Sequence, residues 1–182
     1  MIKRCAWATE EKPHLARYHD EEWGVPVHDD LMHFELVCLE GQQAGLSWEI
    51  ILKKREAYRT LFHGFDPKKV ALMTDKELSC ITQNPAIIRN TLKVFSIRTN
   101  ARAFLKIQAA HGTFDAYIWS FVNGIPLTYQ GFRCLSPESL LISKELKIQG
   151  FTFVGPKIIY SYMQAAGLIF DHTPGCFLFR QP

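Results

Sequence analysis

The sequence contains no apolar run that approaches the roughly 20 residues needed to cross a lipid bilayer. Its first residues, Met1–Cys5, include no apolar stretch of the kind that a secretory signal peptide requires. Internal repeats, low-complexity tracts and linker-like segments are absent as well. With a length of 182 residues, these absences predict a soluble, cytoplasmic protein that folds as a single domain over residues 1–182.

Strong charge of either sign is also lacking, because 21 Lys and Arg against 18 Asp and Glu leave a formal net charge of +3. No basic tail is present. This balance permits binding to a phosphate backbone without requiring it. Any contact with nucleic acid would therefore come from a local patch.

Alternation of polar and apolar residues, the pattern of half-buried strands, is nearly missing. Phe151–Val154 is the best candidate strand, and it is too short to anchor a sheet. Apolar residues recur instead at helical spacing, as in Leu31, Phe34, Val37 and Cys38. The sequence therefore predicts an all-α domain.

Several helix ends carry local signals. Thr74 and Glu77 fit a capping box, in which each side chain bonds the other residue's amide. A long helix is predicted over Asn90–Ala110, closing at Gly112. Further helix starts are predicted at Asp66–Pro67, Ser136–Pro137 and Pro156.

Five cysteines are an odd number, poorly suited to a fully paired disulfide framework. Cys5 and His19 near one end, and His172 and Cys176 near the other, could form a metal site. Two thiolates and two imidazoles are a complete tetrahedral ligand set for zinc, and such a closed site would be structural. Because the spacing of Cys5 and His19 is wide and irregular, ordinary buried packing of these side chains is the alternative.

The other histidines have no partner at a metal-ligand spacing. They are predicted to be solvated surface groups: His14, His28, His33, His63 and His111.

The segment Cys38–Trp48 begins in an amphipathic helix and then carries an acid, two amides and two glycines before a tryptophan. The glycines weaken a helix by about 1 kcal/mol each, so they indicate close approach of backbone or ligand. Glu40 is expected to be partly buried, where an unpaired carboxylate favours a cationic or donor-rich ligand. The aromatic candidates around it are Trp7, Tyr18, Trp23 and Trp48. Stacking and cation–π attraction suit a flat, positively charged base, whereas plain core packing is the alternative for each ring.

These segments resemble the bacterial 3-methyladenine DNA glycosylase I family. The similarity runs from about residue 4 to residue 176. The matching motifs are Cys5–Trp7, Tyr18–Asp20, Glu22–Pro26, Leu39–Trp48, Ala86–Asn90, Trp119–Asn123, Gly150–Gly155, Asp171–His172 and Gly175–Cys176.

The resemblance implies a helix-hairpin-helix glycosylase fold and a monofunctional enzyme that cleaves only the N-glycosidic bond of 3-methyladenine in double-stranded DNA. It implies no obligate protein partner, and we expect a monomer. One structural Zn²⁺ would be held by Cys5, His19, His172 and Cys176. The implied base pocket consists of Glu40, Tyr18, Trp48, Trp23 and Trp7.

The hairpin departs from the family pattern, because Ala86 stands where a glycine is usual and Thr91 where a basic residue is frequent. A glycine there permits positive φ and lets backbone amides reach a phosphate. The alanine bears on hairpin geometry and DNA affinity rather than on the pocket. Arg89 and the hairpin amides, including those of Ile87 and Ile88, are the expected phosphate contacts.

Methylation at N3 makes adenine a cationic and therefore good leaving group, so the protein must mainly extrude the base and hold it. Glu40 is expected to accept hydrogen bonds from the base edge beside Tyr18, with Trp48 stacking on the base. An orienting role of Glu40 toward the attacking water is a further hypothesis. Two rival functions are a zinc-stabilised DNA-binding protein that has lost its chemistry, and a zinc-dependent hydrolase. The second rival needs an open coordination position, which two Cys and two His do not leave.

Overall fold

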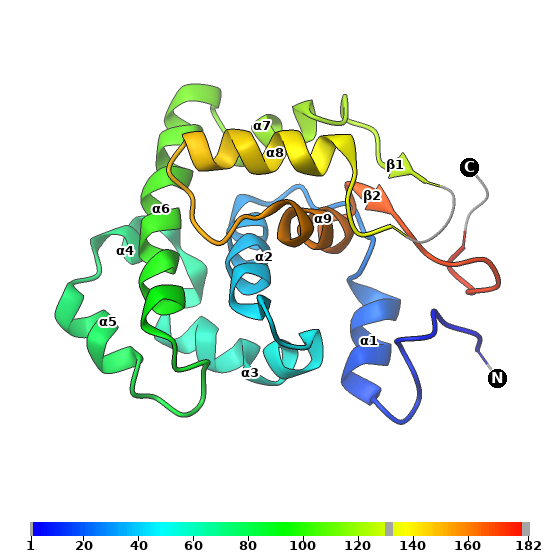
Figure 1. Cartoon of the computed structure of the whole chain (residues 1–182), viewed down its shortest axis with the longest axis horizontal. Helices are drawn as coiled ribbons and strands as arrows, with labels where there is room; N and C mark the ends of the chain where they lie inside the picture. The colour runs from blue at the N-terminus through cyan, green and yellow to red at the C-terminus, as the bar shows by residue number, and fades with distance from the viewer. Residues whose placement is uncertain (1, 130–132, 180–182) are drawn as a thin grey trace.

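The computed structural model describes residues 2–129 and 133–179 of the predicted 1–182 domain, and the other residues lie outside the described part. The described residues form a helical domain with one pair of very short strands (Figure 1). The all-α prediction is confirmed. The elements are α1 (Pro13–Glu21), α2 (Asp30–Gln43), α3 (Trp48–Leu61), η1 (His63–Phe65), α4 (Pro67–Leu72), α5 (Asp75–Ile81), α6 (Thr91–His111), α7 (Phe114–Ser120), β1 (Leu127–Thr128), α8 (Pro137–Ile148), α9 (Pro156–Ala165) and β2 (Ile169–Phe170).

Local capping positions most of the predicted helix ends. The capping box of Thr74 and Glu77 opens α5. The Asn90 side chain accepts from the first turn of α6, and Gly112, with φ 85°, ends that helix. Each cap satisfies helix-end amides that would otherwise lack a partner. The predicted starts at Asp66–Pro67, Ser136–Pro137 and Pro156 are also present. Helices α1 and α7 were not predicted from the sequence.

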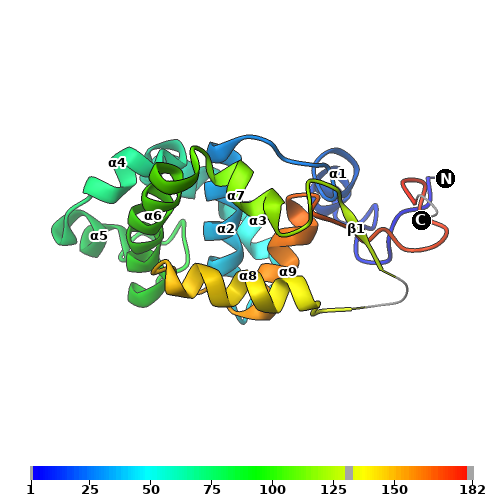
Figure 2. The same ribbon diagram turned by 90° about the horizontal axis from the view of Figure 1, so that it is seen from above.

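Helix α2 runs through the middle of the domain, against α3, α6, α7 and α9 (Figures 1 and 2). Its buried residues run without interruption from His33 to Gln42. An amphipathic helix on the surface would keep one polar face in water, so a helix buried all round belongs to the core. The acid near its end, Glu40, is consequently drawn into the interior.

The candidate strand at residues 151–154, judged too short to anchor a sheet, does not form. This segment is irregular, and Phe153 has a φ of 56°. The side chain of Asn100 replaces a strand partner, because its Oδ1 accepts from the Thr152 amide at 2.8 Å and its Nδ2 donates to the Thr152 carbonyl at 3.1 Å. The short strands β1 and β2 pair in parallel elsewhere, with Leu127 opposite Ile169.

The surface position predicted for His33 is also wrong. Its side chain is fully buried, with Nδ1 2.7 Å from the Tyr162 hydroxyl and Nε2 3.1 Å from Asp115 Oδ1. Burial lowers the pKa of this imidazole. The residue faces the core because every residue of α2 from His33 to Gln42 is buried. The other four histidines predicted at the surface are exposed or half-buried: His14, His28, His63 and His111.

The segments that precede α1 and follow β2 lie side by side at one end of the domain (Figures 1 and 2). The Phe177 amide donates to the Lys3 carbonyl at 2.8 Å. This arrangement brings residues of the two ends of the chain together. Among the described residues, no helix combines the length and the apolar character that a bilayer crossing requires.

Candidate active site and metal centre

A pocket of about 550 Å³ is lined by the N-terminal segment, α1, α2, the start of α3, α9 and residues that follow the two short strands. All five residues predicted for a base pocket line it. They are Trp7, Tyr18, Trp23, Glu40 and Trp48. The fold therefore gathers these five side chains around one space.

Glu40 is the buried acid of this pocket. The residue is 4% exposed, and its Oε2 has no hydrogen-bond partner among the described residues. Burial raises the pKa of the carboxyl from an ordinary 4.5 to about 8. An ionised carboxylate in such a place is costly unless a cation or hydrogen-bond donors meet it. The pocket is thus prepared for a ligand that supplies positive charge or donors.

Aromatic rings surround the acid. The Tyr18 ring lies 5.5 Å from the Trp48 ring, centroid to centroid, and the Trp7 and Trp23 rings meet edge to face at 5.1 Å. Burial, and then the negative charge of Glu40, raise the pKa of Tyr18 well above its ordinary value. The Tyr18 hydroxyl is therefore a neutral donor near the carboxyl. Flat π-faces beside a carboxyl are suited to a planar cationic ligand.

The glycine that follows the acid serves protein packing. A Cβ on Gly41 would lie only 3.2 Å from the Cβ of Phe153. The close approach predicted for this glycine is therefore made by the irregular segment around Phe153. Gly45 has a φ of 77° and lies within the turn between α2 and α3, in a conformation that favours glycine.

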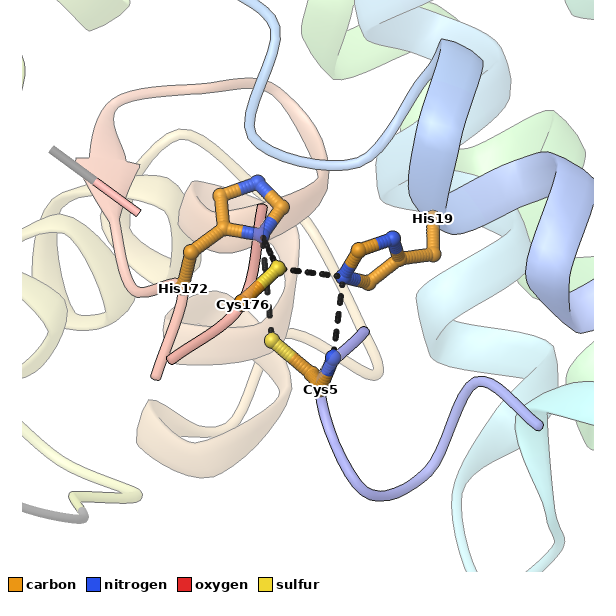
Figure 3. Close-up of side chains that lie close together, drawn as sticks. All are labelled: Cys5, His19, His172 and Cys176. Carbon is orange, nitrogen blue, oxygen red and sulfur yellow. Dashed lines mark hydrogen bonds between the residues drawn. The ribbon is translucent and has the colours of Figure 1, made fainter. Parts of the chain in front are cut away.

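Figure 3 shows the side chains of Cys5, His19, His172 and Cys176 converging on one point. All four are buried, and their ligand atoms lie within 4.8 Å of one another. Cys176 Sγ is 3.4 Å from His19 Nε2 and 3.6 Å from His172 Nδ1. Cys5 Sγ is 3.7 Å from His172 Nδ1. The four residues could hold a metal ion, as the predicted ligand set requires.

A second layer of contacts orients the cluster. The other ring nitrogen of His19, Nδ1, is 2.8 Å from Asp20 Oδ1, and the Arg4 guanidinium donates to both oxygens of Asp20. The Thr173 amide donates to Cys5 Sγ at 3.4 Å. Outer partners of this kind fix the ring orientation of ligating histidines.

The predicted DNA-contacting hairpin lies outside the pocket lining. Arg89 is exposed, whereas the Ile87 side chain is 2% exposed and packs in the core. The Ile88 amide donates to the Tyr58 hydroxyl at 3.1 Å, and the Ala86 amide donates to the Asn84 side chain at 2.9 Å.

Two of the hairpin amides therefore already have side-chain partners inside the protein, whereas the Arg89 side chain is exposed. Ala86 is not among the described residues with positive φ. The alanine thus fits this turn without a left-handed backbone.

Some pocket residues were not predicted from the sequence. They come from segments remote from the N-terminal motifs and include Arg133, Cys134, Ser161 and Gln164. No local pattern marks them, because their role depends on which segments the fold places opposite α1 and α2.

Solved structures share this fold. A crystal structure of a 3-methyladenine DNA glycosylase I superposes with a TM-score of 0.94 at 45% identity, covering 98% of this chain and 100% of the other. A structure concerning 3-methyladenine recognition by the Staphylococcus aureus glycosylase I gives a TM-score of 0.92 at 39% identity, covering 97% and 96%. The fold is thus that of a helical DNA glycosylase.

The similarity extends to the sequence over almost the whole chain. The DNA-3-methyladenine glycosylase 1 of Escherichia coli K12 is 46% identical over 180 residues, which is 96% of each chain. The methyladenine glycosylase family model matches residues 7–180. The chain belongs to the methyladenine glycosylase family.

Proposed function

We propose that the protein is a monofunctional base-excision repair enzyme that hydrolyses the N-glycosidic bond of 3-methyladenine in alkylated double-stranded DNA. Family membership supports the reaction class, since the similar Escherichia coli protein is named for it. The observation that carries the substrate class is the buried Glu40 carboxyl, whose Oε2 has no hydrogen-bond partner among the described residues, in a pocket lined by aromatic rings.

The chemistry of the substrate fits this pocket. A purine methylated at N3 carries positive charge while it is attached to the sugar, and the base leaves with the electron pair of the glycosidic bond. Glu40 accepts hydrogen bonds from the edge of the extruded base, and its charge favours a cation over unmethylated adenine. Tyr18 lies beside it, and Trp48 stacks on the base.

The cationic base also changes the state of Glu40. At neutral pH the empty pocket holds a protonated carboxyl, because its pKa is about 8. A positive charge at hydrogen-bond distance lowers that pKa and favours the carboxylate. The same carboxylate is the group in the pocket that could orient the water that attacks the sugar as its oxocarbenium character grows.

A strand-cleaving glycosylase would need an amine nucleophile at the pocket. Lys12 is the lysine among the described lining residues, and its Nζ lies 3.2 Å from Glu49 Oε2. A solvated, ion-paired ammonium is a poor nucleophile. This pairing supports hydrolysis of the base without strand cleavage.

Zinc is the metal that we propose for the Cys5, His19, His172 and Cys176 cluster. With Zn–S near 2.3 Å and Zn–N near 2.0 Å, a tetrahedral site places neighbouring sulfur and nitrogen ligands about 3.5 Å apart. The three sulfur–nitrogen separations of 3.4, 3.6 and 3.7 Å agree with that value. A bound zinc would supply cross-linking of the chain ends rather than reaction chemistry, because four protein ligands leave no open position.

DNA is held chiefly through its backbone. Arg89 on the exposed hairpin gives sequence-independent contact with phosphate, and the modest net charge of +3 keeps the binding weak and salt-dependent. The enzyme would act as a monomer in the cytosol, where the chromosome is accessible to it.

The test is release of bases from methylated duplex DNA, analysed by chromatography. We expect a 3-methyladenine peak without 7-methylguanine, and intact strands on a denaturing gel. DNA binding with no released base would support the rival, a binding protein without chemistry. If removal of the metal abolishes activity while the protein stays folded, the second rival, a metal-dependent hydrolase, would be supported.

A further inference from the structure

The pocket is lined by both acidic and basic side chains. Glu40 is buried, whereas the two cationic residues that line the pocket, Lys12 and Arg133, are exposed. A volume of about 550 Å³ lies within the range of pockets that take drug-sized ligands, so a single purine base fills only part of it. Sugar and phosphate of the extruded nucleotide can share the remaining space.

The two exposed cations differ in their partners. Lys12 is paired with Glu49 at 3.2 Å. Arg133 has no carboxylate within 4.0 Å among the described residues. The nearby acid Asp171 accepts instead from Tyr160 at 3.2 Å and from Gln164 at 2.6 Å.

The guanidinium of Arg133 is nevertheless held in place. Its Cζ lies 4.8 Å from the centroid of the Tyr129 ring, and the Tyr129 hydroxyl donates to Glu138 at the start of α8. A cation stacked on an anchored ring loses less conformational freedom on binding than a free surface side chain.

The sign of the charge identifies the ligand group. A guanidinium repels a cationic base, so Arg133 has no favourable contact to make with 3-methyladenine itself. Its planar donors match phosphate oxygens, which accept two parallel hydrogen bonds. Building on the proposed function, we propose that Arg133 binds the backbone phosphate that flanks the extruded nucleotide.

This contact should form only when a nucleotide is extruded toward the pocket. In this respect it differs from the contact of Arg89 with phosphate, which does not depend on extrusion. Arg133→Gln should therefore weaken binding to a duplex with a stable abasic-site analogue about tenfold at low salt. Binding to the same duplex without the lesion, and binding of free 3-methyladenine, should stay as in the parent. The slope of log affinity against log salt for the lesion duplex should fall by about one.

Two matched variants complete the experiment, which measures fluorescence anisotropy of labelled duplexes and thermal melting of each protein. Arg133→Lys keeps the charge and should retain most of the salt slope. Lys147→Gln removes an exposed charge of α8 that does not line the pocket and should bind both duplexes like the parent.

Equal losses on lesion-containing and undamaged duplexes, or no loss at low salt, would overturn the assignment of Arg133. Failure of the parent to release 3-methyladenine would instead overturn the proposed function, so the two failures are distinguishable.

Discussion

Trp23 packs edge to face on His172, with ring centroids 4.7 Å apart, so a wall of the pocket rests directly on the Cys/His cluster. Trp23 also stacks on His19 at 6.1 Å. Any change in the cluster should therefore reach the pocket through this tryptophan.

Removing one ligand should release the metal and destabilise the fold. We expect about one zinc per chain in the parent by elemental analysis, and Cys176→Ala should lose it together with several kcal/mol of unfolding free energy. The melting temperature should drop accordingly. Binding of free 3-methyladenine should weaken too, because Trp23 loses its support.

Cys80→Ala is the matched control, since Cys80 is an exposed free cysteine remote from the cluster. This variant should bind as much metal as the parent and should have the same melting temperature. Stoichiometric zinc in both Cys5→Ala and Cys176→Ala would show that the ligand assignment is wrong.

Glu40→Gln should impair recognition while preserving the fold. The amide keeps the size of the carboxyl but removes its charge and replaces one acceptor with a donor. Loss of a charge-assisted hydrogen bond to the donors on the base edge, worth roughly 1.5–3 kcal/mol, should weaken binding of 3-methyladenine about 10–100-fold. The measurements are binding of free 3-methyladenine and base release under single-turnover conditions.

Glu11→Gln, at an exposed position outside the pocket lining, controls for the loss of one negative charge. It should behave like the parent. If Glu40→Gln also binds and excises like the parent, the pocket assignment fails.

The same substitution should change how stability depends on pH. The folded protein holds the Glu40 proton up to a pH of about 8, whereas the unfolded chain releases it near 4.5. The stability linked to this proton is complete below about pH 4.5 and is lost as the pH rises toward 8. Because glutamine does not titrate, the stability of Glu40→Gln relative to the parent should increase across that range by up to a few kcal/mol.

Urea unfolding of both metal-loaded proteins at pH 5 and pH 8 measures this difference. Other titrating groups are common to the two proteins and cancel in the comparison. A constant difference at both pH values would contradict the raised pKa of Glu40.

Arg89→Ala should weaken DNA binding about equally in every sequence context, because phosphate contacts carry no base information. The loss should shrink at high salt. Titration of abasic-site and undamaged duplexes of several sequences measures it, with Lys106→Ala on α6 as a control exposed cation. An unchanged dissociation constant at low salt would refute the placement of the hairpin on DNA.

Much of the architecture follows from short-range signals. The capping box at Thr74, the cap at Asn90 and the stop at Gly112 each depend on atoms within a few residues, so the sequence alone predicts them. The five pocket residues and the four cluster residues were found through motifs, and the fold brings each set together.

The sequence by itself thus determined the helical class, most of the helix ends and the chemical types available for a site. Only the tertiary structure decided which side chains lose water. His33 is predicted at the surface yet is buried, and the alternating segment 151–154 bonds the Asn100 side chain instead of a neighbouring strand. The sequence likewise does not predict that Arg133 lines the same pocket as Glu40. The burial of a side chain and the charges around it depend on contacts between segments far apart along the chain. No local sequence pattern specifies which of these segments come into contact.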